Sequence, residues 1–399
     1  MATRTGTRAV ELATGDLVTS SVTIPQTMRA AVLVAPGEPL QVRHIRTPRP
    51  RSGEVLVKVT ACGLCHSDLH VISGKIPFPT PAVLGHEVSG TVVELGPNTG
   101  HAGLALGDGV CGAFLMPCGQ CADCARGRDD LCKPFFEFNR LHGQLFDGES
   151  RLADLDGNCI AQYSMGGLAE YCVIPVTSVT PMPNGMDAVA AAILGCAAMT
   201  AYGAVRRGAD LRYGETVAII GIGGVGSNIV QVAHELGARK VIAIDVDDDK
   251  LEAAIRHGAS DVINSRYLDA RDRVFELTGG RGVDVAIEAL GFPRTFEQAL
   301  TLLADGGRMV PVGLAAGTQT AAVEINRVVR RGQQICGSYG ARTRTDLPTV
   351  VDLAARGVLD YRGVVSERVS LSNAHATYHR LEQGKVSGRA VVEMALNDR

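Results

Sequence analysis

The chain has 399 residues, which is long enough for two or three domains with a large buried core. Hydrophobic residues make up 46% of it and charged residues 20%, which excludes a chain that is disordered along most of its length. The net charge is only −3 at pH 7, and no apolar run reaches the roughly 18 residues of a membrane span, so the composition indicates neither a nucleic-acid-binding protein nor a membrane protein.

The first part of the chain predicts an extension followed by a β-rich region. Residues 1–27 are polar and rich in threonine and lack the apolar segment of a secretory signal, so we expect a flexible extension on a cytoplasmic protein. Beyond them, short apolar runs are separated by Pro and Gly, which is typical of strands joined by turns. The runs that predict strands are AAVLVA (30–35), EVLVKVT (54–60), SGTVVELG (89–96) and AEYCVIP (169–175).

From about residue 199, predicted strands alternate with predicted helices. The strands are ETVAII (215–220), VIAIDV (241–246), VDVAIEAL (283–290), GRMVPVGL (307–314) and QQICGSYG (333–340); KLEAAIRHG (250–258) and RTFEQALTLLA (294–304) predict helices. Such alternation predicts an α/β fold with a doubly wound parallel sheet. It ends near residue 341, so we expect a Rossmann domain over 198–340, inserted in a β-rich domain formed by 28–197 and 341–399.

A glycine loop follows the first of these strands directly, because residues 221–226 match G-x-G-x-x-G. Gly221 permits a tight turn, Gly223 lets a pyrophosphate approach the backbone, and Gly226 allows a helix to pack closely on the strand. Gly224 and Val225 open that helix, whose free N–H groups favour phosphate binding. The loop therefore predicts a dinucleotide site.

The next strand ends in an acidic residue that indicates which dinucleotide is bound. Asp245 lies 19 residues after Gly226, close to the spacing of about 20 at which a carboxylate binds the ribose 2′-hydroxyl. Three further aspartates follow at 247–249 and no arginine does, so a 2′-phosphate would be repelled. We predict NAD rather than NADP. The alternative is a helix-capping turn with a solvated acidic loop.

Four of the eleven cysteines, Cys118, Cys121, Cys124 and Cys132, lie within 15 residues. Four thiolates at such spacing can close a tetrahedral shell around Zn²⁺ and make a structural site. An iron–sulfur cluster is the competing interpretation, but the last gap of seven residues differs from the C-x3-C-P of ferredoxins. The spacing favours zinc over the cluster, and over four unrelated buried thiols.

Three other segments carry residues suited to a catalytic metal. They contain Cys62-Gly-Leu-Cys65-His66-Ser67-Asp68-Leu69-His70, then Gly85-His86-Glu87, and much later Leu194-Gly195-Cys196. Spacing alone does not select the ligands from these residues, and Cys62 with Cys65 could also form a redox dithiol. All these motifs, the four-cysteine lobe (117–133) and the glycine loop occur in an order that resembles the zinc-dependent alcohol dehydrogenases of the medium-chain dehydrogenase/reductase superfamily. The resemblance runs from about Met28 to the C-terminus and implies that the β-rich domain is GroES-like.

The resemblance also implies roles for individual residues. A catalytic zinc would be bound by Cys65, His86 and Cys196, with Asp68 orienting the histidine and Glu87 lying behind the metal. The proton of the bound alcohol would pass through Ser67 and His70. Further cofactor contacts would be His66, Thr200, Lys250, Val312 and Arg389, and the substrate channel would include Ile76, Phe114 and Leu314. His70 as a surface histidine and Arg389 as a solvated charge remain alternatives.

The resulting prediction is an NAD-dependent enzyme with two zinc ions, which oxidises a primary or secondary alcohol reversibly to an aldehyde or ketone by hydride transfer. Two alternatives remain: a dehydrogenase for a thiol–formaldehyde adduct, and a catalytically silent zinc- and nucleotide-binding module. An anionic substrate would require an inward-pointing cation, for which Lys133 and Arg140 are the nearby candidates. The long loop after Cys132 resembles the often dimeric branch of the family, and we expect a homodimer or homotetramer with a small-molecule substrate.

Overall fold

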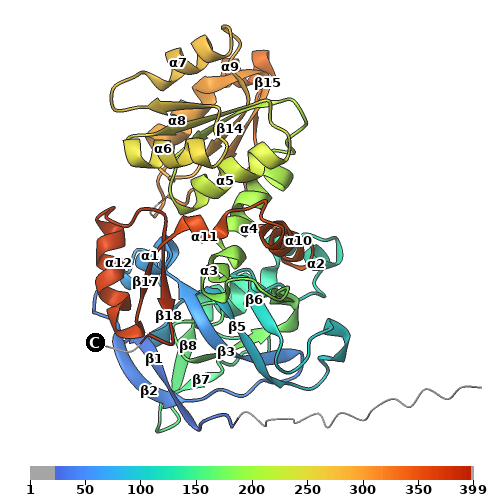
Figure 1. Ribbon diagram of the computed structural model, residues 1–399, viewed down its shortest axis with the longest axis vertical. Coiled ribbons are helices and arrows are strands. Elements are labelled where there is room, and N and C mark those ends of the chain that lie inside the picture. Colours follow the sequence, from blue (N-terminus) through green and yellow to red (C-terminus); the bar gives the residue numbers. More distant parts are fainter. Residues whose placement is uncertain (1–22, 316, 397–399) are drawn as a thin grey trace, which may run out of the picture.

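The structure is a computed structural model, and it describes residues 23–315 and 317–396. The predicted extension therefore lies largely outside the described residues. Figure 1 shows two parts, one built around a sheet flanked by helices and one rich in strands, with both chain ends of the described region in the second part. This is the predicted combination of a Rossmann-type fold and a β-rich domain, and the fold class is confirmed.

The first part is a six-stranded sheet in which every pair of neighbours is parallel. Its spatial order is β13 (Asp261–Asn264), β12 (Lys240–Asp245), β11 (Thr216–Ile220), β14 (Val283–Glu288), β15 (Leu303–Pro311) and β16 (Gln334–Ile335). The helices between them are α5 (Gly224–Glu235), α6 (Asp248–Arg256), α7 (Ala270–Leu277), α8 (Pro293–Leu302) and α9 (Ile325–Arg331).

Central strand β11 is buried along its whole length, as expected for a parallel strand with helices on both faces. Its successive side chains join different hydrophobic clusters: Val217 and Ile219 lie in the main core with α5, and Ala218 and Ile220 pack with α7 and α8. One boundary prediction is wrong. Leu303 and the residue after it continue the helical periodicity, but they are buried as the first residues of β15.

The second part contains two sheets. One has the order β2 (Gln41–Arg46), β1 (Thr27–Leu33), β4 (Ala82–Val83), β8 (Cys159–Gln162) and β7 (Leu152–Ala153). The other has the order β10 (Val179–Pro181), β6 (Gly109–Gly112), β5 (Glu87–Leu95), β3 (Glu54–Gly63), β18 (Arg389–Glu393) and β17 (Val365–Val369), with β9 (Tyr171–Pro175) also beside β3. The C-terminal strand thus returns to the first region of the chain, pairing Val391 with Gly63.

Further helices, most of them short, connect these strands and the two parts. In the β-rich part they are α1 (His66–Ile72), η1 (Gly100–Ala102), α2 (Ala122–Ala125), η2 (Asp129–Leu131), the π-helix η3 (Phe135–Leu141), η4 (Val176–Ser178), η7 (Leu371–Asn373) and α12 (Ala374–Glu382). Near the junction lie α3 (Ala188–Ala191), η5 (Ala192–Gly195), α4 (Ala197–Tyr202), η6 (Gly203–Gly208), α10 (Thr343–Ala355) and α11 (Tyr361–Val364) (Figure 1).

Among the described residues no single helix is long and apolar enough to cross a membrane. The bent pair Ala188–Gly195 and Ala197–Gly208 passes that test by length and composition alone.

Candidate metal centres and cofactor site

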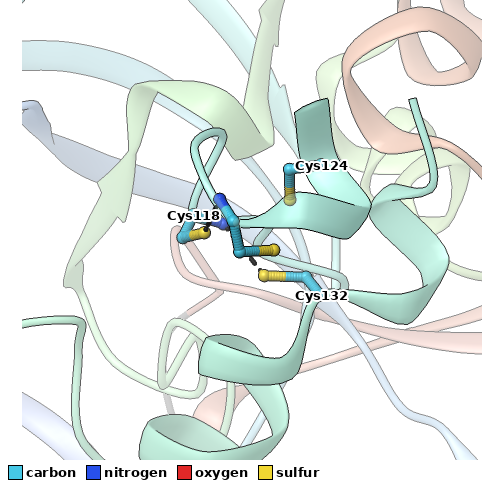
Figure 2. Close-up of side chains that lie close together, drawn as sticks. Cys118, Cys124 and Cys132 are labelled. Atoms are coloured by element: carbon cyan, nitrogen blue, oxygen red, sulfur yellow. Dashed lines mark hydrogen bonds between the residues drawn. The ribbon is translucent and has the colours of Figure 1, made fainter. Parts of the chain in front are cut away.

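The four cysteines of the lobe form one cluster, with all sulfur atoms within 4.8 Å of one another. Cys121 precedes α2, Cys124 lies within it, and Cys132 follows η2. Figure 2 shows the side chains of Cys118, Cys124 and Cys132 converging. The backbone N–H of Cys118 donates to the sulfur of Cys132 over 3.2 Å, and that of Cys121 donates to the sulfur of Cys118 over 3.3 Å. Such donors stabilise thiolates, and four thiolates with no open position fit a structural zinc.

The thiols of this cluster differ in their readiness to ionise. Burial raises the pKa of Cys132 to about 11. Burial also acts to raise the pKa of Cys121, but hydrogen bonds with the backbone and with the thiols of Cys124 and Cys118 bring it down to about 7. A divalent cation is what allows four such neighbouring thiols to be thiolates together.

A second cluster lies in the β-rich part and consists of Cys65, His86, Glu87 and Cys196, whose ligand atoms are also within 4.8 Å of one another. Antiparallel pairing of β3 with β5 sets Gly63 opposite Glu87, and this brings the residues at the two strand ends together. All four members of the cluster are buried.

Glycines allow this close approach. A Cβ on Gly63 would lie 2.1 Å from Oε2 of Glu87, and a Cβ on Gly195 would lie 1.9 Å from the carbonyl oxygen of Gly112. Neither position therefore accepts a side chain without displacement of its neighbours. The second glycine lets the segment with Cys196 pass directly over β6 and reach the cluster.

Asp68 orients His86. Nδ1 of His86 is 3.1 Å from Oδ1 of Asp68, and the hydroxyl of Tyr378 donates to Oδ2 over 2.7 Å. Burial acts to lower the pKa of His86, but the carboxylate of Asp68 and the thiol of Cys65 outweigh it and raise the pKa to about 10. With Nδ1 committed to the carboxylate, Nε2 is the nitrogen available to a metal ion, which would take the place of the proton.

Glu87 faces an arginine from the C-terminal strand. Nη2 of Arg389 lies 3.1 Å from Oε1 of Glu87, an ion pair by distance without the alignment of a hydrogen bond. Burial raises the pKa of Glu87 to about 7, and Arg389 opposes this rise. Arg389 is itself 3% exposed, so the alternative of a solvated charge is wrong.

The glycine loop joins β11 to α5 as predicted. Gly221 has φ +92°, where a side chain would be strained, and a Cβ on Gly226 would lie 1.9 Å from the carbonyl oxygen of Gly221. Asp245 ends β12; its Oδ2 accepts from the N–H of Ile222 and its Oδ1 from the N–H of Val246, both over 2.7 Å. Oδ1 also accepts from the N–H of Asp247 over 3.2 Å, so Oδ2 is the oxygen that keeps a further lone pair for a ribose hydroxyl.

The remaining predicted cofactor residues lie around the junction of the two parts. Desolvation lowers the pKa of His66; Cys65 opposes this, while the positive charges of Arg389 and Lys250, and that of His70 when it is protonated, reinforce it. His66 therefore lies near residues of both parts. Further cofactor candidates are Thr200, a buried residue of α4, and Val312, whose N–H donates to the carbonyl of Glu288.

The proton-relay candidates are on α1, directly beside the second cluster. Oγ of Ser67 is 3.7 Å from the sulfur of Cys65. His70 lies three residues further along the helix, which places it on the same face as Ser67. Burial, reinforced by Lys75, lowers the pKa of His70 from 6.5, so its imidazole is neutral at pH 7.

Aromatic side chains line the side of the cluster where the substrate pocket is predicted. The ring of Phe114 lies 6.0 Å from that of His86 and 5.6 Å from that of Tyr339. The ring of Tyr163 lies 5.7 Å from that of His86. Ile76 is partly buried, whereas Leu314 is 50% exposed.

Sequence reasoning missed three tyrosines of this region: Tyr163, Tyr339 and Tyr378. No motif or spacing links them to the metal cluster, because each comes from a different distant segment. Of the two cations considered for an anionic substrate, Lys133 is exposed, and Arg140 lies among the aromatic rings.

Comparison with known proteins gives consistent matches along most of the chain. The family described as "Alcohol dehydrogenase GroES-like domain" matches residues 51–184, and "Zinc-binding dehydrogenase" matches residues 224–356. An alcohol dehydrogenase of Geobacillus stearothermophilus is 35% identical over 371 residues, covering 92% of this chain and 99% of the relative. An S-(hydroxymethyl)glutathione dehydrogenase of Synechocystis sp. is 33% identical over 370 residues, covering 91% and 99%.

Solved structures agree with these matches. Benzyl alcohol dehydrogenase from Acinetobacter calcoaceticus superposes with a TM-score of 0.86 at 28% identity, covering 93% of this chain and 100% of that one. Acetophenone reductase from Geotrichum candidum, solved in complex with NAD, superposes with a TM-score of 0.76 at 29% identity, covering 93% and 98%.

Proposed function

The chain belongs to the zinc-binding alcohol dehydrogenases of the medium-chain dehydrogenase/reductase superfamily, and we propose that it oxidises a primary or secondary alcohol reversibly with NAD as the hydride acceptor. At the coarser level it is a zinc-dependent dehydrogenase that acts on an alcohol or a thiol adduct. The observation that carries the finer proposal is the buried cluster of Cys65, His86 and Cys196 with the hydroxyl of Ser67 beside it.

The cluster suits a catalytic rather than a structural zinc. Cys65, His86 and Cys196 would hold the ion through two thiolates and an imidazole, and Glu87, the remaining member, faces Arg389, so this set would leave a position for the substrate oxygen. A zinc ion held there would supply a Lewis acid for the substrate oxygen. Ser67 would take the proton that the alcohol loses and release its own hydroxyl proton toward His70, whose lowered pKa leaves its imidazole neutral at pH 7 and able to accept a proton. The four-cysteine lobe would hold the second, structural zinc.

NAD is the cofactor that this chain's residues suit. The carboxylate of Asp245 stands at the end of β12, and the aspartates that follow it oppose a 2′-phosphate. The buried Nε of Arg389 has no hydrogen-bond partner among the described residues, and it lies where a Cβ on Gly224 would come within 2.6 Å of it. It is therefore an unused donor beside the N-terminus of α5, where a pyrophosphate would bind.

The test is NADH formation at 340 nm by zinc-loaded protein with aliphatic alcohols, benzyl alcohol and S-(hydroxymethyl)glutathione. We expect turnover of simple alcohols, and we expect Ser67→Ala to lower kcat about 100-fold or more. Ser73→Ala, an exposed serine at the end of the same helix, is the matched control and should change kcat less than about twofold.

Two results would redirect the proposal. Turnover of the glutathione adduct alone would favour the second candidate, which the match to the Synechocystis dehydrogenase supports. Zinc and NAD binding without turnover of any substrate, in either direction, would leave a non-catalytic module. Assembly as a homodimer or homotetramer stays a prediction.

A further inference from the structure

One arginine near the metal cluster is held among aromatic rings. Arg140 comes from η3, and its guanidinium carbon lies 4.1 Å from the ring centre of Tyr163, 4.9 Å from that of Phe135 and 5.9 Å from that of Phe114. These rings attract the cation through their π faces. An arginine also has five N–H donors that point outward in the plane of the guanidinium, and the aromatic rings do not accept hydrogen bonds from these.

The guanidinium has no acceptor of its own among the described residues. Its Nε and Nη1 atoms are buried without a hydrogen-bond partner, and no carboxylate forms an ion pair with it. Two other buried arginines pair with carboxylates: Arg151 bonds Glu54 and Asp147, and Arg389 faces Glu87. A buried cation with unused donors is costly unless an anion completes it.

The aromatic enclosure of Arg140 borders the catalytic cluster. The ring of Tyr163 lies next to both the cation and a metal ligand: its centre is 4.1 Å from the guanidinium carbon of Arg140 and 5.7 Å from the ring centre of His86. Phe114 likewise lies between them, at 5.9 Å from the guanidinium and 6.0 Å from the imidazole. The cation is therefore about one aromatic ring away from the metal ligand. Arg140 as a whole is only half-buried, so part of it stays accessible.

The surroundings hold this arrangement rigidly. Asn139, next to Arg140, is 1% exposed; its Oδ1 accepts from the N–H of Ser164 over 2.9 Å, and its Nδ2 donates to the carbonyl of Ser164 over 3.1 Å. Oγ of Ser164 in turn donates to the carbonyl of Phe114 over 2.9 Å. Hydrogen bonds thus join Asn139, Ser164 and the backbone of Phe114. They fix the neighbours of Arg140 and Tyr163 relative to one another, as a preorganised binding site requires.

We propose that Arg140 binds the carboxylate of the substrate, so that the substrate is an alcohol with a carboxylate about one aromatic ring away from its hydroxyl carbon. This inference rests on the proposed alcohol dehydrogenase activity of the same site. The guanidinium fork matches a planar carboxylate through two parallel hydrogen bonds. A phosphate would bring a second negative charge to a single guanidinium.

The test compares two substrates of the same shape, 4-(hydroxymethyl)benzoate and 4-methylbenzyl alcohol, in zinc-loaded protein with NAD. We expect kcat/KM to be about 10- to 100-fold higher for the carboxylate, as a charge-assisted pair implies. Arg140→Met keeps an apolar side chain of similar length in the enclosure. It should reduce the ratio of the two kcat/KM values to about one by raising KM for the carboxylate substrate. Arg140→Lys keeps the charge without the fork and should give an intermediate ratio. Lys133→Met, an exposed cation of the same segment, is the matched control and should leave the ratio unchanged.

Two results would overturn the inference: an unchanged ratio in Arg140→Met, or an equal loss on both substrates, which would show that the cation only supports the aromatic packing. If Arg140→Met does not fold, the inference is tested by comparing two inhibitors of the wild-type protein. 4-Methylbenzoate should compete with 4-methylbenzyl alcohol at least tenfold more tightly than 4-methylbenzamide, and equal inhibition would refute the inference.

Failure of the proposed function is distinguishable from failure of this inference. In that case neither alcohol turns over while NAD still binds, and calorimetric titration with the same benzoate and benzamide tests Arg140 directly. Binding of the benzoate that is lost in Arg140→Met would support the carboxylate site. Equal binding of both compounds would exclude it.

Discussion

Tyr378→Phe tests whether the hydrogen bonds behind His86 hold the catalytic metal in place. The hydroxyl of Tyr378 donates to Oδ2 of Asp68 over 2.7 Å, and both residues are buried. Oδ1 of Asp68 has partners in His86 and the N–H of Gly85, so the tyrosine is the one partner of Oδ2 among the described residues. The variant leaves a buried carboxylate oxygen without a donor.

The expected magnitude follows from that single bond. A hydrogen bond to a charged group contributes about 1.5–3 kcal/mol, so we expect the free energy of unfolding to fall by about 2 kcal/mol. Loss of an outer contact of a metal ligand typically weakens metal binding 10- to 100-fold. We expect the lower end, about tenfold, because Asp68 keeps its contact with His86.

The assay is zinc competition with a chelator of known affinity, read as two separate losses of metal per chain, together with urea unfolding. The four-cysteine lobe serves as an internal reference and should release its zinc as in the wild type. Tyr361→Phe is the matched control, since this buried hydroxyl accepts from the N–H of Asp187 and not from a group at the metal cluster. The reasoning would be refuted if the site that releases its zinc more readily had the same zinc affinity in Tyr378→Phe as in the wild type.

Three further predictions concern the same site. Cys65→Ala should lower the metal content from two zinc ions per chain to one, measured by plasma mass spectrometry, and retention of both would contradict its role as a ligand. Asp245→Gly should reduce the ratio of kcat/KM for NAD over NADP about tenfold or more; the ratio is the proper readout because the carboxylate also holds the N–H of Ile222, and an unchanged ratio would count against the assignment. Burial and Lys75 lower the pKa of His70, so kcat/KM for alcohol oxidation should fall as pH falls through a value below 6.5, where the imidazole becomes protonated. His70→Gln should remove this acidic limb of the pH profile. An identical pH profile in the variant would exclude the histidine from the relay.

The parts of this fold that could be predicted from sequence are those in which neighbours in the chain are neighbours in space. In the βαβ unit, the strand, the glycine loop and the helix follow one another, and Asp245 ends the adjacent strand. The four cysteines likewise lie within a short segment and form one cluster. Local spacing in such segments reports directly on geometry, so a motif is enough.

The catalytic cluster shows where that reasoning ends. Cys65, His86 and Cys196 come from three segments, and only the resemblance to a family selected them from the other cysteines and histidines. The structure supplies the physical reason for their meeting: pairing of β3 with β5 brings the first two together, and the absence of a side chain at Gly195 admits the third. Neither fact can be derived from the spacing of the ligands.

The C-terminal segment explains why the rest could not be predicted. Tyr378 on α12 reaches Asp68, and Arg389 at the start of β18 reaches Glu87, across about 300 residues in each case. The contact of Arg389 arises because β18 pairs with β3, the strand that leads into the segment containing Cys65, and the contact of Tyr378 arises because α12 packs against α1. The last strand of the chain therefore supplies the buried cation of the metal cluster and, through its unpaired Nε, a donor beside Gly224 of the glycine loop. The C-terminal segment contributes to both the metal cluster and the glycine loop because its strand β18 is part of the sheet that contains β3. The sequence of this segment has no periodicity that would predict this function.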